Sequence, residues 1–381
     1  MTVVHANSTA AVVDAVRAAT QPFEIVGGGT RRGVGHAVRA ETVLDMSGFV
    51  GAIDHDPAEL VVTVRPGTPV ADVVAVLAGN GQRLAFEPPD LAPTWGGTAG
   101  AGTIGGLVAA GLAGPRRVIA GGVRDHVLGF EAVNGLGEVF VAGGKVLKNV
   151  TGFDLPKLMA GSWGTLAVLT EISLKALPIP GDTGSLVVSG LDAAAAVLAM
   201  TRALQGTVPI TGAAYLPGNP TRTVVRLEAN PRVLETQRGE VAAALTPHAI
   251  DWIDAAASQA LWRDIGAVAP FIADAEALLW RVVMPPNAAP AFVARLDTVD
   301  GVLLDWGGAL AWVWHRADAP VDLHAAAAAI GGHAMLVRAP DAVKARIGVF
   351  PPLLPAHAAL QGRVRTAFDP AGLFNPGRMG G

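Results

Sequence analysis

The sequence predicts an α+β fold with two domains and a C-terminal segment. Stretches of β-branched residues alternate with stretches whose apolar residues recur at helical spacing. Apolar residues make up 51% of the 381 positions, which is enough to fill sizeable cores. A proline-rich turn at 178–182 is the strongest candidate for a domain boundary. We therefore expect domains at 1–180 and 181–340, followed by a segment at 341–381.

The first domain contains two helices whose ends can be read from the chain. Ser8 is a suitable N-cap for a helix that reaches Ala19. Pro69 suits the first turn of a second helix, which stops at Gly79. The apolar face of this second helix would consist of Val70, Val73, Val74 and Leu77. Strands are expected at 23–26, 42–45, 60–64, 127–134, 138–142 and 165–177.

The second half alternates between strands and helices. Strands are expected at 186–188, 223–227, 278–284 and 309–315, and helices at 192–204, 232–245 and 288–299. This alternation suits a smaller α+β domain. Three tryptophans, Trp306, Trp312 and Trp314, are interpreted as core packing rather than as a substrate cage.

The most informative stretch is a glycine turn after the strand at 23–26. Gly27, Gly28 and Gly29 are followed by Thr30 and Arg31. Glycines let another molecule approach the backbone, and consecutive N–H groups in such a turn can bind an anion. Our hypothesis is a cradle for the diphosphate of a dinucleotide. The alternative is an ordinary hairpin turn, because a single glycine motif is a weak signal.

Composition excludes several classes of protein. The chain has 28 basic and 32 acidic residues with no long block of one sign, which argues against nucleic acid as the main partner. It has no cysteine, so it cannot bind an iron–sulfur cluster through its own thiolates. The first residues lack the pattern of a signal peptide, and we expect a soluble cytoplasmic protein. The uncharged stretch 91–115 is long enough to span a bilayer, but it is too rich in glycine to form a stable spanning helix.

Residues 100–105 form a G-x-G-x-x-G pattern, with Asp125 twenty positions beyond the last glycine. This is nominally the fingerprint of a Rossmann dinucleotide site. The context does not fit, because the fingerprint should come after an apolar strand and open a long helix. Here a proline-containing stretch precedes it, and Gly111 and Gly114 interrupt the helix after it. We therefore do not predict a Rossmann fold.

Several spaced motifs together resemble a known family. In order they are the glycine turn, Thr103-Ile104-Gly105-Gly106, a basic pair, Lys148-Asn-x-x-Gly-Phe-Asp-Leu, Gly161-Ser-Trp-Gly-Thr-Leu, Leu169-Thr-Glu-Ile and the tail 368–378. This order resembles the vanillyl-alcohol-oxidase (PCMH-type) FAD-binding family and, within it, the GlcE subunits of bacterial glycolate oxidase. The likeness implies a two-lobed FAD-binding domain, a smaller α+β cap domain, and a C-terminal segment that returns to the FAD domain. Phe153 stands where the family usually has tyrosine.

The resemblance implies which residues hold non-covalent FAD. They are Val26, Gly27, Gly28, Gly29, Thr30, Arg31, Pro88, Thr103, Gly105, Gly106, Ala109, Gly114, Arg116, Asp125, Val168 and Ile172. Arg116 and Arg117 could neutralise phosphate or form a surface pair that faces a partner. His36 is a poor match to the position where some relatives attach flavin covalently. No counterpart of the metal-binding histidines and acid of D-lactate-dehydrogenase-like relatives is found, so no metal is expected.

The resemblance also implies a function and partners. It points to an FAD-binding subunit of a glycolate oxidase that oxidises a 2-hydroxy acid, beside a catalytic FAD subunit and an iron–sulfur subunit that passes electrons toward a membrane quinone. Association with the inner face of the plasma membrane would then be peripheral. His333 and Arg338 are weak candidates for proton transfer and for carboxylate binding. The alternatives are a self-sufficient FAD-dependent oxidase of 2-hydroxy acids or alcohols and a non-catalytic scaffold subunit.

Overall fold

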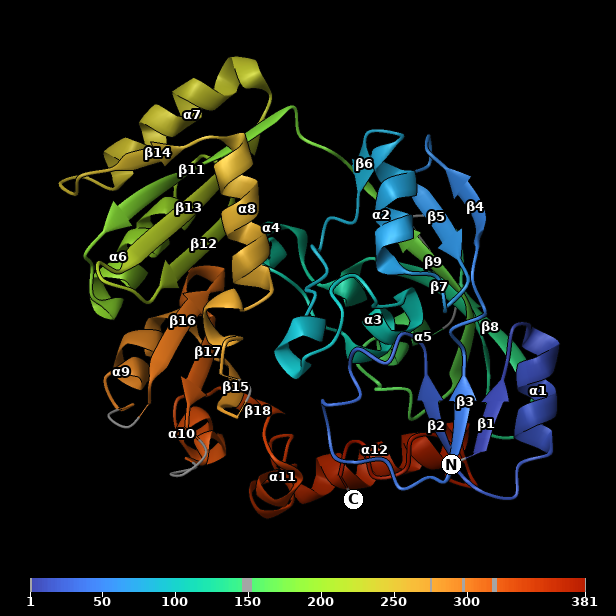
Figure 1. Ribbon diagram of the computed structural model, residues 1–381. Helices are drawn as coiled ribbons and strands as arrows, with labels where there is room; N and C mark the ends of the chain where they lie inside the picture. Colours follow the sequence, from blue (N-terminus) through green and yellow to red (C-terminus); the bar gives the residue numbers. More distant parts are fainter. Residues whose placement is uncertain (1, 146–152, 275, 297–298, 317–320, 381) are drawn as a thin grey trace. The chain divides into compact units, whose positions relative to one another are not determined.

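The computed structural model describes residues 2–145, 153–274, 276–296, 299–316 and 321–380, so most of the motif at 148–155 lies outside it. The chain forms two compact units (Figure 1). The first unit comprises Met1–Leu112, Gly122–Ile179 and Pro352–Gly381, and the second comprises Ala113–Gly121 and Pro180–Pro351. The division after Ile179 lies in the proline-rich turn. Residues 113–121 and 341–351, in contrast, belong to the second unit rather than to the segments in which we expected them.

A three-stranded parallel sheet opens the first unit. Its strands are β1 (Thr2–His5), β2 (Phe23–Val26) and β3 (Thr42–Asp45), in the order β1-β3-β2. Helix α1 (Thr9–Arg17) begins after Ser8, whose hydroxyl accepts a hydrogen bond from the Ala11 amide at 3.2 Å. Val12 and Val16 of α1 are buried in one cluster with Leu44 of β3. The structure thus confirms the predicted cap and the predicted strands at 23–26 and 42–45, whereas β1 was not predicted.

The second sheet of the first unit is antiparallel and carries the larger core. Its strands are β4 (Ala52–Asp56), β5 (Val61–Val64), β7 (Val127–Val133), β8 (Val139–Gly143) and β9 (Val168–Lys175), in the order β4-β5-β9-β7-β8. Helices α2 (Val70–Ala78) and α3 (Ile104–Ala110) contribute to this core. In α2, Val73 and Leu77 are buried, but Val74 is 43% exposed, so the predicted apolar face is wrong at that position. Val74 is adjacent to Val73 in sequence and therefore points about 100° away around the helix.

Shorter elements complete the first unit. They are β6 (Gln82–Arg83), β10 (Leu177–Pro178), η1 (Ala92–Trp95), η2 (Val123–Asp125), α5 (Leu155–Met159) and α12 (Pro355–Phe368). The C-terminal tail adds a parallel bridge between Phe23 and Phe374 at the edge of β2. The chain therefore returns to the strand before the glycine turn, although about 350 residues separate the two.

An eight-stranded antiparallel sheet forms the second unit. Its strands are β11 (Asp182–Ser189), β12 (Ile210–Leu216), β13 (Arg222–Ala229), β14 (Asp251–Ile253), β15 (Leu278–Val283), β16 (Gly301–Asp305), β17 (Leu310–His315) and β18 (His333–Arg338). Their order is β14-β11-β13-β12-β16-β17-β15-β18. The remaining elements are α4 (Arg117–Ala120), α6 (Ala193–Leu204), α7 (Pro231–Ala244), α8 (Ala255–Gly266), η3 (Ala269–Phe271), η4 (Pro286–Ala288), α9 (Ala289–Val293), η5 (Trp306–Gly308), α10 (Leu323–Ala328) and α11 (Asp341–Ile347).

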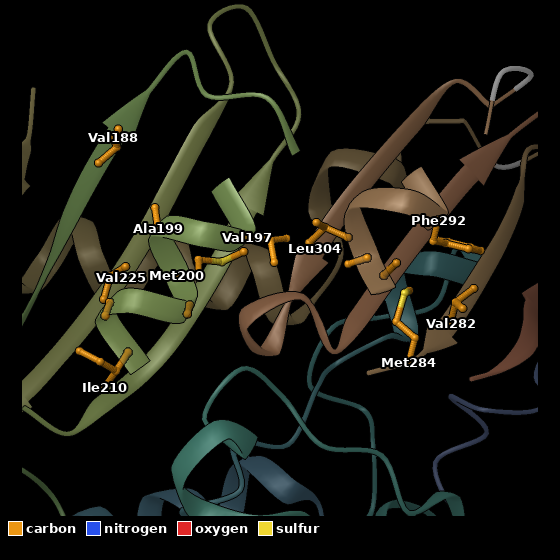
Figure 2. Close-up of a cluster of buried hydrophobic side chains, with 14 of the residues drawn as sticks. Val188, Val197, Ala199, Met200, Ile210, Val225, Val282, Met284, Phe292 and Leu304 are labelled. Atoms are coloured by element: carbon orange, nitrogen blue, oxygen red, sulfur yellow. The ribbon is translucent and has the colours of Figure 1, made fainter. Parts of the chain in front are cut away.

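The two faces of this sheet are covered differently. On one face, α6, α7, α9 and α10 bury the main core, part of which is seen in Figure 2 around Met200, Phe292 and Leu304. On the other face, α8 packs over β11 and β12, where the indole of Trp262 donates to the Ser185 hydroxyl at 2.9 Å. A methyl group at Gly212 would collide with that indole ring, which explains why a glycine occupies this strand position.

Candidate functional site

Distant parts of the chain converge on an open cavity in the first unit, whose empty space, including the part that opens to solvent, is about 870 Å³. The lining residues are 25–32, 46, 66, 103, 105, 106, 109, 110, 162–164, 167–169, 375 and 378. Gly28 and Gly105 therefore line one crevice, and the glycine turn is not an isolated hairpin.

Two backbone segments approach each other at the glycine turn. A Cβ atom at Gly27 would collide with the Thr103 side chain, and one at Gly28 would collide with the Ala101 carbonyl. Gly29 has a φ of +70°, in the left-handed region that favours glycine. The three glycines thus allow the turn after β2 to contact the loop before α3. Both segments then present backbone rather than bulky side chains to the cavity.

Arg31 is a cation that forms no ion pair with any residue that the structure describes. Its Nε is buried without a hydrogen-bond partner, and its terminal nitrogens reach only the Thr30 hydroxyl and the Pro89 carbonyl, both at 3.5 Å. Burial lowers its pKa to about 10, against a weaker opposing effect of Asp90. A buried charge costs free energy unless it is paired. The guanidinium therefore suits an anion bound in the cavity.

The C-terminal tail fixes the wall of the cavity beside β2. Arg378 donates to the carbonyls of Val34 at 2.6 Å and Arg32 at 2.9 Å, and to the Glu24 carboxylate at 3.2 Å. Glu24 is buried and also pairs with the Arg32 side chain. These contacts hold β2 and the residues after the glycine turn in one arrangement.

Asn375 connects the same strand to a third segment of the wall. Its side-chain oxygen accepts from the Ile25 amide at 2.8 Å, and its side-chain nitrogen donates to the Trp163 carbonyl at 2.9 Å. Sequence reasoning matched the tail to a family without giving Asn375 or Arg378 a role. A lone polar residue in a tail carries no pattern that predicts which strand it will contact.

The cavity fits a dinucleotide with an anionic bridge. Its walls combine glycine backbone, small and apolar side chains, and the unpaired Arg31 guanidinium. Glu24, a nearby acid, is already neutralised by Arg32 and Arg378. Within the described ranges, no group of three or more histidine, aspartate or glutamate side chains could hold a metal ion.

Comparison with known proteins identifies the family. A family model described as "FAD binding domain" matches residues 2–143. Glycolate oxidase subunit GlcE of Escherichia coli (strain K12) is 36% identical over 361 residues, which cover 94% of this chain and 92% of that protein. The chain belongs to the GlcE family. Glycolate oxidase subunit GlcD of Bacillus subtilis (strain 168) is 34% identical over 145 residues, 38% of this chain and 29% of that protein.

A solved structure supports the fold predicted from the motifs. An alkyldihydroxyacetonephosphate synthase aligns with a TM-score of 0.66 at 16% identity, covering 98% of this chain and 75% of that one. The α+β, PCMH-type fold is therefore confirmed, and the cofactor of this GlcE-family chain is FAD. The family makes the chain an FAD-dependent oxidoreductase. Among the helices of the described residues, none is both long and apolar enough to cross a bilayer.

Most of the predicted FAD residues of this GlcE-family chain line the cavity. These are Val26, Gly27, Gly28, Gly29, Thr30, Arg31, Thr103, Gly105, Gly106, Ala109 and Val168. Five others do not line it: Pro88, Gly114, Arg116, Asp125 and Ile172. Ile172 is fully buried in the core of the antiparallel sheet, whereas Asp125 is exposed and accepts a hydrogen bond from the Gly122 amide at 2.8 Å. His36, like these five, is absent from the lining.

Gly114 and Arg116 belong to the second unit. The Gly114 carbonyl accepts a hydrogen bond from the Trp306 indole at 3.0 Å. Arg116 makes two parallel contacts to Glu228, at 2.8 and 3.0 Å, and both side chains are largely buried. Its charge is thus already matched by an acid, a geometry typical of strong arginine–carboxylate pairs.

The weak catalytic candidates also lie in the second unit. Arg338 is buried and donates to the carbonyls of Ala277 at 2.9 Å and Phe271 at 3.0 Å, so its guanidinium supports the chain around η3. His333 begins β18 and is exposed, and partial burial together with the charge of Arg281 lowers its pKa. Trp306 and Trp312 are both at least nine-tenths buried.

Proposed function

We propose that this chain is the FAD-binding subunit of a multi-subunit glycolate oxidase, which converts a 2-hydroxy acid to a 2-oxo acid. The observation that carries the proposal is the 36% identity to a glycolate oxidase subunit GlcE over 94% of the chain. The cavity supports it, because its residues suit a non-covalently bound dinucleotide. His36, the poor match to a covalent attachment position, does not line the cavity.

In this proposal, residues from three parts of the first unit hold the cofactor. The turn at Gly27, Gly28 and Gly29 offers backbone N–H groups, and Arg31 offers charge, to the diphosphate. Asn375 and Arg378 keep the surrounding segments in place. FAD held there would supply the acceptor for the hydride that leaves the hydroxyl-bearing carbon of a 2-hydroxy acid. Apolar side chains, among them Val168 and Leu169, line part of the cavity.

The proposal includes two partner subunits. With no cysteine, the chain has no thiolate for an iron–sulfur cluster, so a cluster that receives electrons must belong to another chain. The partial likeness to a glycolate oxidase subunit GlcD supports a related FAD subunit as the catalytic partner. We further propose that the complex works in the cytoplasm and meets the inner face of the plasma membrane only through these partners.

The test is purification of the chain alone and with its partner subunits, followed by flavin absorption and by glycolate-dependent reduction of a dye. We expect the isolated chain to be yellow and inactive, and the complex to be active. The control is the same complex assembled without this chain, which should lose activity. A yellow chain that reduces the dye by itself would establish a self-sufficient oxidase instead. A colourless chain that still assembles the complex would establish a scaffold.

A further inference from the structure

Three ionisable residues, one each from β15, β16 and β18, lie on the face of the second unit's sheet that is opposite the main core. In the register of the sheet, Arg281 of β15 pairs with Trp312 of β17 on one side and Met335 of β18 on the other. In the next row, Val283 pairs with His333 and with Leu310, which in turn pairs with Asp305. Directly paired residues point to the same face of a sheet, and so do residues two apart along a strand. Arg281, His333 and Asp305 therefore share one face.

Two arginines stack on a single tryptophan, Trp306. The guanidinium carbons of Arg117 and Arg281 lie 5.0 and 5.1 Å from the Trp306 ring. Trp306 is fixed, because its indole donates to the Gly114 carbonyl and its amide donates to the Asp305 carboxylate at 2.7 Å. Trp306 has a φ of +54°, in a region that costs a non-glycine residue free energy and that recurs at functional sites.

Arg281 has no counter-ion within hydrogen-bond reach. Across the ranges that the structure describes, its guanidinium makes no hydrogen bond or ion pair. Buried Arg226 and Arg338 differ, because both donate to backbone carbonyls. Loss of water around Arg281 and repulsion by Arg117 lower its pKa to about 10, while Asp305 acts in the opposite sense. Arg281 as a whole residue nevertheless keeps part of its surface exposed.

The charges of the cluster match a monoanion. Arg117 and Arg281 contribute two positive charges and Asp305 one negative charge, which leaves one positive charge unmatched. Partial burial and the charge of Arg281 lower the pKa of His333 and so favour the neutral imidazole, which can donate or accept one hydrogen bond. A planar guanidinium binds a carboxylate through two parallel hydrogen bonds.

We propose that Arg281, with Arg117 and His333 beside it, forms a binding site for the carboxylate of a small 2-hydroxy or 2-oxo monocarboxylic acid. Arg281 supplies the paired donors, Trp306 holds both guanidinium groups in place, and His333 contacts a neighbouring polar group of the ligand. This inference rests on the proposed function for the identity of the acid, but not for the existence of the site.

Calorimetric titration of the full chain with glycolate tests the site, with FAD-free and FAD-loaded protein measured separately. The Arg281→Gln variant should bind glycolate about tenfold more weakly or worse, since it loses a charge-assisted hydrogen-bonded pair. Arg117→Gln should weaken binding less, because Arg117 is exposed. Glycolamide, the neutral analogue, should not compete with glycolate.

Arg238→Gln is the matched control. Arg238 also stacks on a tryptophan, at 4.8 Å from the Trp252 ring, but it already pairs with Glu235. This variant should bind glycolate like the wild type. Arg281→Gln should melt at the same temperature as the wild type or higher, because it removes an unpaired charge. Arg281→Lys keeps the charge without the paired donors, and its affinity should fall between those of the wild type and Arg281→Gln.

Three results would overturn the site: wild-type affinity in Arg281→Gln, equal binding of glycolamide and glycolate, or no glycolate binding by the wild-type chain. Sulfate bound as tightly as glycolate at equal ionic strength would overturn the carboxylate assignment. The two proposals fail separately. A complex that is inactive while the chain binds glycolate contradicts the proposed function, and an active complex whose Arg281→Gln form is unimpaired contradicts this site.

Discussion

Replacing Arg31 should affect the stability of the protein and its affinity for FAD in different ways. Its guanidinium forms no ion pair within the described part of the chain, so Arg31→Met should leave the free energy of unfolding of the FAD-free protein unchanged or raise it. The same variant should bind FAD more weakly by about 1.5–3 kcal/mol, the usual contribution of a hydrogen bond to a charged group. Urea unfolding and flavin-fluorescence titration measure the two effects.

Arg124→Met is the control for that experiment, because Arg124 is an exposed arginine of the same unit. It should change neither quantity by more than about 0.5 kcal/mol. A destabilised FAD-free Arg31→Met protein would mean that the guanidinium has a partner within the fold. Undiminished FAD affinity would remove Arg31 from the site.

Individual charged residues were the hardest to assign from the sequence. Arg31 and Arg116 each come after a glycine-containing stretch, and both were expected to bind phosphate. Only Arg31 lines the cavity, whereas Arg116 pairs with Glu228, 112 positions away in the chain. Such a partner depends on the tertiary fold, and no local pattern reveals it. Arg281 was missed for the same reason, since one arginine in an apolar strand carries no motif.

At the scale of elements, the start of α3 contains two adjacent glycines with different roles. A Cβ at Gly105 would lie 2.9 Å from Cβ of Pro66 and 3.0 Å from its carbonyl oxygen, which is too close. A Cβ at Gly106 would have no contact closer than 3.5 Å, to the Thr103 hydroxyl, and Gly106 lines the cavity. Gly105 is thus required for packing, while Gly106 leaves room for a ligand.

We therefore expect opposite outcomes for two neighbouring substitutions. Gly105→Ala should destabilise the protein by about 1–3 kcal/mol, the usual cost of overpacking. Gly106→Ala should be neutral or stabilising by up to about 1 kcal/mol, because alanine favours a helix, yet it should weaken FAD binding. Thermal unfolding and FAD titration of the two variants check this. If the two variants changed thermal stability and FAD affinity equally, the different roles given to Gly105 and Gly106 would be wrong.

The C-terminal tail is the element whose loss should affect both folding and binding. Asn375→Ala removes hydrogen bonds to the Ile25 amide and the Trp163 carbonyl, and it places alanine at a φ of +44°. It should destabilise the protein by about 2–4 kcal/mol and weaken FAD binding. Glycine adopts the left-handed backbone without strain, so Asn375→Gly measures the loss of the hydrogen bonds alone. Unchanged FAD affinity in both variants would show that the tail does not position the cavity.

The ends of helices and strands were predicted well from the sequence where a capping residue or a turn residue lies next to the element. Ser8 caps α1, and the strand at 23–26 ends at the glycine turn, because these preferences act within a few residues. The face of α2 was predicted less well. Val70, Val73, Val74 and Leu77 are equally apolar, and only the surrounding packing leaves Val74 exposed. Five of the family motifs, in contrast, supply cavity walls: the glycine turn, 103–106, 161–166, 169–172 and the tail. The basic pair at 116–117 does not line the cavity.

For the whole molecule, FAD binding should stabilise the two units unequally. A ligand that binds only the native state slows hydrogen exchange in the structure that forms its site. The stabilisation grows with the logarithm of the ligand concentration relative to Kd. The lining segments 26–31, 103–110, 163–169 and 375–378 should therefore exchange amide hydrogens more slowly with FAD. The β11–β13 part of the second unit should be unchanged. Hydrogen-exchange mass spectrometry with and without FAD tests this, and uniform protection of both parts would contradict it.

The route of the chain limits how this molecule can be divided. Residues 113–121 leave the first unit, contribute the Gly114 carbonyl and Arg116 to the second, and return before β7. A fragment starting at Pro180 would thus lack the acceptor of the Trp306 indole and the cation that neutralises Glu228. The second unit cannot be expressed or transplanted as one continuous cassette, and a working excised version would need the 113–121 peptide grafted back onto it.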